Sequence, residues 1–360
     1  MDVTRIELRS FRNHERLTVD LAPGLNFLVG PIGSGKTSVV EALHVGCTGH
    51  SFRTSNEREM VRFGDGAARV ELTCRGEGGA HRIEVVLQTG ASKQIKRDGV
   101  KLSVLRADAS TPRVCVFAPD HLELVKGPAG IRRAHLDELV AALWPARRAT
   151  RLAYAKALAQ RNSLLGRVRS GLAAPTALGA WDHELAGHGI ELMRHRADAI
   201  GLLVDPFTAR AQDLGLPTPA TVTYRPRSKA SDVSGLEEEL RERLASDLER
   251  GFTTHGPHRD DFVLRAADRD LRRYGSQGQQ RLALLSLLLS EREAMEDAHG
   301  ELPVLLLDDV MSELDPVRRR LLLDLLVSPG QTLITTADEG ALPLELGTTL
   351  RLDRPAETVA

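Results

Sequence analysis

The stretch Gly30-Pro31-Ile32-Gly33-Ser34-Gly35-Lys36-Thr37 decides the fold predicted for this chain. It matches the phosphate-binding loop pattern, in which two glycines with four residues between them are followed by Lys and a hydroxyl residue. Glycine lets the backbone curl so that successive N–H groups point at phosphate oxygens. In this pattern Lys36 supplies a positive charge for the β- and γ-phosphates, and the Thr37 hydroxyl is a ligand for Mg²⁺.

The segments on either side of this loop support the same interpretation. The apolar run from Leu25 to Val29 predicts a buried strand, and Thr37 to Cys47 predicts a helix whose N-terminus faces the phosphates. A glycine-rich turn that binds nothing would need neither flank, so we expect the chain to bind a nucleoside triphosphate. The candidate binding residues here are Gly30, Pro31, Ile32, Gly33, Ser34, Gly35, Lys36, Thr37 and Ser38.

Composition limits the class of protein. The 360 residues are 42% hydrophobic, and no apolar run reaches the ~20 residues of a membrane span. No basic segment followed by an apolar run opens the chain, and three widely spaced cysteines favour reduced thiols, so we expect a cytoplasmic protein without a membrane segment. With 48 basic and 49 acidic residues, any site for a polyanion must come from local clusters.

The pattern along the chain predicts an α/β domain interrupted by a helical insertion. Alternating strands extend to about residue 120, with a hairpin turn at Asp98-Gly99. From about 130 to 215 the spacing is helical and predicts three or four antiparallel helices, punctuated at Gly171–Pro175 and at Gly187–Gly189. The last third alternates strand and helix again.

Two carboxylates follow an apolar run near the C-terminus. Val304 to Leu307 predicts a parallel strand buried on both faces, and such strands end where ligands bind in open sheets. We expect Asp308 to hold Mg²⁺ and Asp309 to polarise the attacking water. Farther on, Asp315 and Pro316 predict the cap and first residue of another helix.

A second candidate anion site lies at Tyr274-Gly275-Ser276-Gln277-Gly278-Gln279-Gln280-Arg281, ahead of an apolar helix. No strand precedes it closely enough for a second phosphate loop. A protein with two half-sites of this kind can close on nucleotide as a dimer, each copy offering this helix to its partner's phosphates. The alternative is an ordinary capped core helix.

These motifs, in this order, resemble the SMC-type branch of the ABC ATPases, and their details resemble the RecF family of bacterial recombination mediators. The resemblance extends from residue 1 to about 340. The matching stretches are Ser10–Asn13, Ser51–Thr54, Phe117–Asp120, Arg132-Arg133 and Thr254–Asp261, together with the Ser276 and Asp308 motifs.

The resemblance implies an ABC-type ATPase head formed by residues 1–121 and 218–360, with a mostly helical arm at 122–217. It implies ATP as cofactor, ATP-dependent homodimerisation and slow, DNA-stimulated hydrolysis. It also implies binding of double-stranded DNA at gaps and single-strand/double-strand junctions, partnership with RecR, and help in loading RecA, with RecO in the same pathway. Ser276, with Gln277, Gly278 and Gln279, would act in trans on the γ-phosphate, Arg12 near the nucleotide, and His258 and Arg259 at the domain junction.

Two positions depart from the family pattern. Where the family usually carries Asn, this chain has Ile32, and a β-branched residue tolerates positive φ poorly. Either the loop is strained or nucleotide-coupled contacts to the partner are lost, so we expect nucleotide binding to survive while hydrolysis or dimerisation weakens. An Ile32→Asn variant with unchanged turnover and dimerisation would refute this. The His that many ABC ATPases carry after the last strand is replaced by the threonines of Leu333–Thr336.

Basic clusters are the candidates for DNA contact, because phosphate contacts dominate non-specific affinity. An aromatic fraction of 4% leaves few stacking platforms and favours duplex over single-strand binding. Taken singly, such a cluster is more often a solvated face than a DNA contact. The candidates are Lys93, Lys96, Arg97 and Lys101; Arg132 and Arg133; Arg147, Arg148 and Arg151; and Arg225, Arg227 and Lys229.

Two other functions share the nucleotide chemistry. An ABC transporter ATPase subunit would have a compact head without an arm at 130–215, and a His after the last strand. A small-molecule kinase would leave the Ser276 motif without a role. Slow, DNA-stimulated ATPase activity that depends on protein concentration would separate the three.

Overall fold

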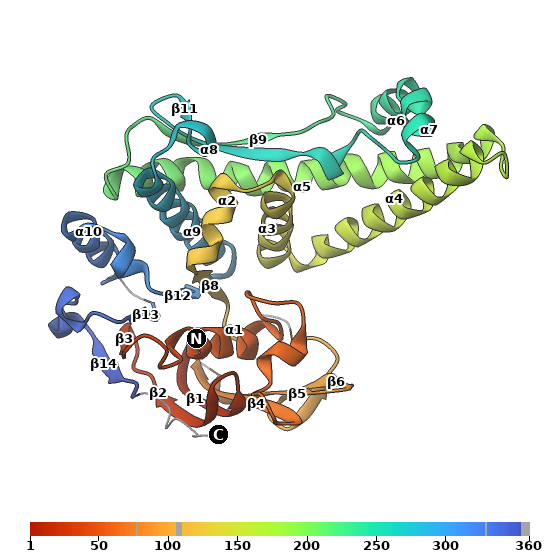
Figure 1. Ribbon diagram of the computed structural model, residues 1–360. Helices are drawn as coiled ribbons and strands as arrows, with labels where there is room; N and C mark the ends of the chain where they lie inside the picture. The colour runs from red at the N-terminus through yellow and green to blue at the C-terminus, as the bar shows by residue number, and fades with distance from the viewer. Residues whose placement is uncertain (77, 106–109, 328–329, 354–360) are drawn as a thin grey trace. The chain divides into compact units, whose positions relative to one another are not determined.

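The computed structural model describes residues 1–76, 78–105, 110–327 and 330–353 (Figure 1). The chain divides into two compact units. The head unit comprises Met1–His121, Asp213–Gly215 and Glu291–Ala360, and the arm unit comprises Leu122–Gln212 and Leu216–Ser290. Among the helices in the described ranges, none has both the length and the apolarity needed to cross a membrane.

One sheet of the head unit is antiparallel, in the order β2-β1-β4-β5-β6-β7. Alternation buries Ile6 and Leu8 on one face of β1, and a register shift between Val3 and Arg5 brings Val3 into the same core cluster. The predicted hairpin is confirmed, since Arg97 pairs with Val100 across Asp98-Gly99. The strands are β1 (Asp2–Phe11), β2 (His14–Asp20), β4 (Ala67–Gly76), β5 (Gly79–Gln88), β6 (Ala91–Arg97) and β7 (Val100–Leu102).

The other sheet of the head unit is parallel, in the order β14-β3-β13-β12-β8. Every residue of β3, β12 and β13 is buried, which explains why these segments are apolar without alternation. Leu307 aligns with Phe117 on one side and Ile334 on the other, so the carboxyl ends of three strands meet. The strands are β3 (Leu25–Val29), β8 (Val114–Phe117), β12 (Val304–Leu307), β13 (Thr332–Thr336) and β14 (Thr348–Arg351).

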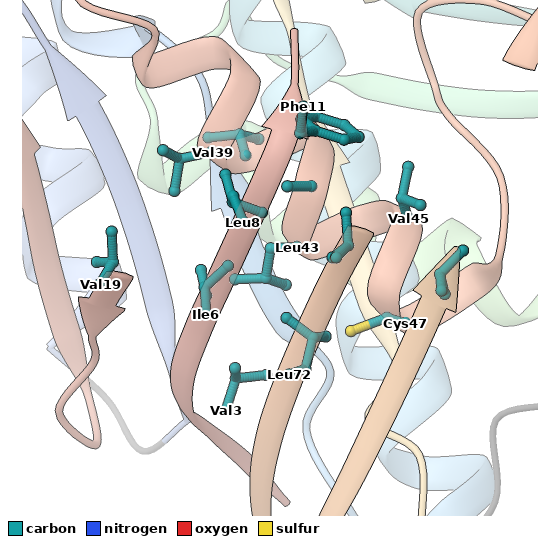
Figure 2. Packing of buried hydrophobic residues seen from close by; sticks show 14 of the residues in the cluster. Val3, Ile6, Leu8, Phe11, Val19, Val39, Leu43, Val45, Cys47 and Leu72 are labelled. Carbon is teal, nitrogen blue, oxygen red and sulfur yellow. The ribbon is translucent and has the colours of Figure 1, made fainter. Parts of the chain in front are cut away.

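Helix α1 (Lys36–Thr48) packs against both sheets of the head unit. Figure 2 shows Val39 and Leu43 of this helix against Ile6 and Leu8 of β1. This burial fixes the helix that carries the end of the phosphate loop. The other elements of this unit are η1 (Glu57–Met60), η6 (Val310–Glu313), α10 (Pro316–Leu326), η7 (Glu339–Ala341) and η8 (Leu344–Leu346), with η2 (Pro119–Leu122) and α9 (Gln277–His299) shared between the units.

The arm unit contains three long helices, α3 (Ala129–Leu143), α4 (Arg148–Arg169) and α5 (Gly179–Asp213), as the spacing predicted. Its sheet has the order β11-β10-β9, and Figure 1 shows α5 running along β9. The strands are β9 (Ala220–Arg225), β10 (Asp261–Ala266) and β11 (Arg269–Asp270). The short helices are α2 (Glu123–Lys126), η3 (Pro145–Arg147), η4 (Pro175–Leu178), α6 (Val233–Glu242), α7 (Leu244–Arg250), η5 (Pro257–Arg259) and α8 (Leu271–Tyr274).

The sequence predicted that the head resumes at residue 218, and the division into units corrects this boundary: residues up to Ser290 belong to the arm unit. Strand β9 pairs with β10, and α3 packs against β10, so both strands belong to the arm unit. The guanidinium of Arg132 on α3 donates to both carboxylate oxygens of Asp261, at 2.6 and 2.9 Å. Strand-like sequence after residue 218 therefore builds a small sheet of the arm unit.

The expected break at Gly187–Gly189 is wrong, because α5 continues through it. A Cβ at Gly189 would lie 2.8 Å from Leu236 Cδ2 and 3.4 Å from the Tyr154 ring. Glycine at this position permits close packing of helices rather than ending one.

Candidate functional site

The phosphate loop joins β3 to α1, and two glycines give it its shape. Gly33 and Gly35 have φ of 85° and 94°, in the left-handed region that side chains disfavour. A Cβ at Gly35 would lie 2.3 Å from His14 Nε2, and one at Gly30 would lie 2.4 Å from the Leu352 carbonyl. The predicted strand and helix are confirmed, with α1 beginning at Lys36.

The strain expected at Ile32 is wrong. Ile32 is not among the residues with positive φ, because the left-handed turns of the loop are taken by Gly33 and Gly35. Its side chain is 84% exposed. The proposed loss of contacts to a partner at this position stays a prediction.

The ammonium of Lys36 lies across the loop. Its Nζ donates to the carbonyls of Gly30 at 2.7 Å and Pro31 at 3.0 Å. Burial lowers the pKa of Lys36, while the charges of Asp309 and Asp308 act in the opposite direction. The charge of Lys36 is therefore coupled to the charges of Asp308 and Asp309 beside the loop.

Asp308 follows β12 and connects three elements of the head unit. Thr37 Oγ1, at the start of α1, donates to Asp308 Oδ2 at 2.8 Å. Thr335 Oγ1, on β13, donates to Asp308 Oδ1 at 2.6 Å. Burial raises the pKa of Asp308, and the hydrogen bonds from Thr335 and Thr37 oppose that rise. The carboxylate is thus held in place on both oxygens.

Asp309 has an unusual backbone conformation that a neighbouring hydrogen bond holds in place. Its φ of 52° is uncommon for a residue other than glycine. Its backbone N–H donates to Thr335 Oγ1 at 3.0 Å, so the same hydroxyl aligns both aspartates. Its Oδ1 is buried and has no hydrogen-bond partner within the described part of the chain. An orphaned carboxylate oxygen beside the loop is available to accept a proton or a water hydrogen bond.

The residues present fit a triphosphate with a divalent cation. A hydroxyl and a carboxylate, from Thr37 and Asp308, are the hard oxygen ligands that Mg²⁺ prefers, with the rest supplied by water and phosphate. Ser34 Oγ is buried in the loop without a partner within the described residues. Those residues contain no cluster of three or more His, Cys, Asp or Glu arranged for a metal.

Arg12 forms an ion pair with Glu41, a residue that the sequence analysis did not identify as a candidate. Its guanidinium donates to both oxygens of Glu41 on α1, at 2.8 and 2.6 Å. Glu41 is fully buried and also accepts from Ser51 Oγ at 2.5 Å and Arg53 at 3.2 Å. The charge of Arg53 lowers the pKa of Asp308, so this cluster extends toward the carboxylates. The sequence feature that could have predicted this pair is Glu41 itself, an acidic residue within an apolar helical segment, four residues after Thr37.

Ser276 and Gln279 form a capping box at the N-terminus of α9. Ser276 Oγ accepts from the Gln279 N–H at 3.2 Å, and the Gln279 side chain accepts from the Ser276 N–H at 2.9 Å. Both Ser276 and Gln277 are exposed. They belong to the arm unit with Gly278, whereas the phosphate loop belongs to the head unit.

His258 and Arg259 lie inside the arm unit, which corrects their expected place at a domain junction. His258 Nδ1 lies 2.8 Å from the Tyr154 hydroxyl, and His258 Nε2 lies 3.0 Å from the Thr253 carbonyl. Burial lowers the pKa of His258 to about 4, so the ring is neutral. Its two ring nitrogens therefore contact two separate segments of the arm unit.

Comparison with known proteins identifies the family. The family model described as "RecF/RecN/SMC N terminal domain" matches residues 2–345. A DNA replication and repair protein RecF from Heliobacterium modesticaldum is 38% identical over 357 residues, covering 96% of this chain and 95% of the relative. The chain belongs to the RecF family.

Solved RecF structures agree with the fold. A recombination mediator protein RecF of the RecFOR pathway, described as RecF-ATPrS, superimposes with a TM-score of 0.85 and 28% identity, covering 99% of this chain and 98% of that one. A second, described as RecF-ATP, gives a TM-score of 0.83 and 29% identity, covering 94% and 93%. The predicted α/β, SMC/RecF-like ATPase head with an inserted arm is confirmed.

Within this RecF-family chain, most basic residues proposed for DNA contact are occupied by neighbouring groups. Ion pairs or hydrogen bonds join Lys93 to Glu57, Lys96 to Glu84, Arg97 to Thr111, Arg132 to Asp261, Arg133 to the Asp260 carbonyl, Arg147 to Asp198 and Arg151 to Asp137. Counting only the part of the chain that the structure describes, side-chain partners are absent for Lys101, Arg148, Arg225, Arg227 and Lys229.

Proposed function

We propose that this RecF-family chain is an ATP-dependent DNA-binding recombination mediator with slow, DNA-stimulated ATPase activity. The observation that carries the proposal is the Thr37–Asp308–Thr335 chain of hydrogen bonds. It joins the helix after the phosphate loop to two strand ends, and so builds a site for a triphosphate and a cation before any ligand arrives.

Each residue of the site has a proposed role in binding or hydrolysis. The N–H groups of Gly33, Gly35, Lys36 and Thr37 bind phosphate oxygens, and Lys36 exchanges its loop carbonyls for the β- and γ-phosphates. Thr37 and Asp308 would hold Mg²⁺, which would supply positive charge against the phosphates. Asp309 orients the attacking water and accepts its proton through the unpaired Oδ1.

The Ser276 helix completes the site from a second copy of the chain. Its first turn exposes Ser276 and Gln277, and the unpaired N–H groups of a helix N-terminus favour phosphate. ATP-dependent homodimerisation would then place Ser276, Gln277, Gly278 and Gln279 of each protomer against the γ-phosphate of its partner.

The proposed cellular role of this chain is based on the names of its relatives. A RecF relative is a DNA replication and repair protein, and the solved RecF proteins are mediators of the RecFOR pathway. We propose that the dimer binds double-stranded DNA at gaps and single-strand/double-strand junctions, partners RecR and helps to load RecA, with RecO in the same pathway. This role belongs in the cytoplasm. A transporter ATPase subunit is not favoured, because β13 ends in Thr335 and Thr336 instead of His.

Sedimentation velocity with and without ATP tests this proposal. The wild type is expected to shift from monomer to dimer on ATP. Lys36→Arg should prevent the shift by impairing the nucleotide site in cis, whereas Ser276→Arg should prevent it while nucleotide still binds. Ser170→Arg, an exposed serine at the end of α4, controls for the added charge. A Ser276→Arg protein that still dimerises on ATP would contradict the proposal.

A further inference from the structure

A basic hollow lies on the arm unit, and none of its lining residues belongs to the nucleotide loop. It has a volume of about 170 Å³ and lies between strand β10 and the short helices α2 and α8. Arg225 on β9 is directly opposite Asp261 on β10, so both side chains project from the same sheet face. Arg272 and Arg273 of α8 complete the basic wall.

The charges in this hollow do not balance. Arg132 and Asp261 neutralise each other through two hydrogen bonds, and two backbone carbonyls also bind Arg132. In the residues that the structure describes, no carboxylate pairs with the guanidinium of Arg225, Arg272 or Arg273; the Arg272 guanidinium donates only to the Lys126 carbonyl, at 3.3 Å.

The one remaining acid of the hollow, Asp270, caps α8 by accepting from the Arg272 N–H at 2.9 Å. Three exposed guanidinium groups therefore share a concave surface with a single carboxylate that is already engaged. Like charges gathered in this way repel one another unless an anion joins them.

The apolar lining argues against a peptide as the occupant. Its members are buried, at 2–9% exposure, so they offer no open apolar pocket for the anchor side chains on which peptide affinity depends. Phosphate groups need only guanidinium donors, and Arg binds them in a bidentate manner. The apolar residues of the lining are Leu124, Val125, Phe262, Val263 and Leu264.

We propose that this hollow, with Arg225, Arg272 and Arg273, binds the phosphodiester backbone of double-stranded DNA. It supplies a contact surface for the DNA binding proposed above, and so rests on that function. Two of the three residues lie immediately before Tyr274-Gly275-Ser276, so DNA on this surface would contact the segment that leads into the Ser276 helix. Backbone contacts of this kind fix position without reading sequence.

Duplex binding, measured by fluorescence anisotropy over a range of KCl concentrations, tests the proposal. Each phosphate contact contributes about 0.9 to the slope of log affinity against log salt concentration. Arg225→Gln and Arg273→Gln should therefore each lower that slope by about 0.9 and weaken binding on the order of tenfold near 0.1 M salt. Arg167→Gln, an exposed arginine on α4 outside the hollow, is the matched control.

The outcomes separate this site from the function on which it rests. If the wild type does not bind duplex DNA at all, the proposed function fails. If the wild type binds and the hollow variants keep its affinity and slope, or lose no more than the control, the function stands and this site is overturned. ATP titrations distinguish the phosphate source: unchanged ATP affinity in Arg225→Gln is expected, and its loss would assign the hollow to free nucleotide and overturn the proposal.

Discussion

Two threonine hydroxyls hold the Asp308 carboxylate, and this arrangement sets both the chemistry and the cost of the site. Thr37 and Thr335 bond its two oxygens, yet burial still raises its pKa. A raised pKa means that ionisation favours the unfolded state, so the ionised carboxylate destabilises the fold at neutral pH. A buried carboxylate with a perturbed pKa is typical of a functional site.

Asp308→Asn should therefore stabilise the nucleotide-free protein while abolishing hydrolysis. We expect the Tm to rise by about 1–3 °C at pH 7, because the buried charge is removed and the amide keeps hydrogen-bonding groups. The difference from wild type should shrink as pH falls and the wild-type carboxyl becomes protonated. Differential scanning calorimetry across pH measures both effects.

Asp315→Asn is the control, since Asn replaces Asp well at the exposed N-cap of α10. Its Tm should match that of the wild type or lie slightly below it, because the exposed ion pair with Arg318 is lost, and it should not rise. A lower Tm for Asp308→Asn at neutral pH would show that the ionised carboxylate stabilises the fold, which is the opposite of the effect expected from its burial.

At the scale of elements, two glycines in α5 look alike in sequence but have opposite roles. A Cβ at Gly187 meets nothing within 4 Å, whereas one at Gly189 would lie 2.8 Å from a terminal carbon of Leu236. Leu236 is buried on α6 and cannot move away freely. Close packing against α6 therefore requires glycine at position 189, whereas position 187 has room for a side chain.

Gly187→Ala should raise the free energy of unfolding by about 0.5–1 kcal/mol, because alanine is the better helix former. Gly189→Ala should be less stable than Gly187→Ala by at least ~1 kcal/mol, since overpacking offsets the same helical gain. Urea unfolding followed by circular dichroism compares the two. Equal stability of the variants would contradict the packing described at Gly189.

For the whole molecule, what the sequence predicted depends on how local each feature is. The loop at Gly30–Thr37 and the strand before Asp308 carry their geometry in consecutive residues, so pattern alone placed them. Arg12 with Glu41, and Arg225 with Arg273, come together only through sheet pairing and packing between distant segments. The hydrophobic periodicity of a sequence does not predict such contacts between distant residues.

The same reason explains where prediction failed. Strand-like and helical segments alternate after residue 218 as they do in the head, but β9 and β10 pair with each other within the arm unit. Ile32 was expected to strain the loop because its type was known and its φ was not. Residue types fix local preferences, whereas partners and dihedral angles depend on the rest of the fold.

A single ATPase site formed by Lys36 of one protomer and Ser276 of its partner can be tested by mixing two inactive variants. Each mixed dimer of Lys36→Arg and Ser276→Arg chains contains one intact site, so an equal mixture should hydrolyse ATP at up to about a quarter of the wild-type rate. Each variant alone should be inactive. A Ser276→Arg protein that hydrolyses at the wild-type rate alone, or a mixture no more active than its separate parts, would contradict the shared site.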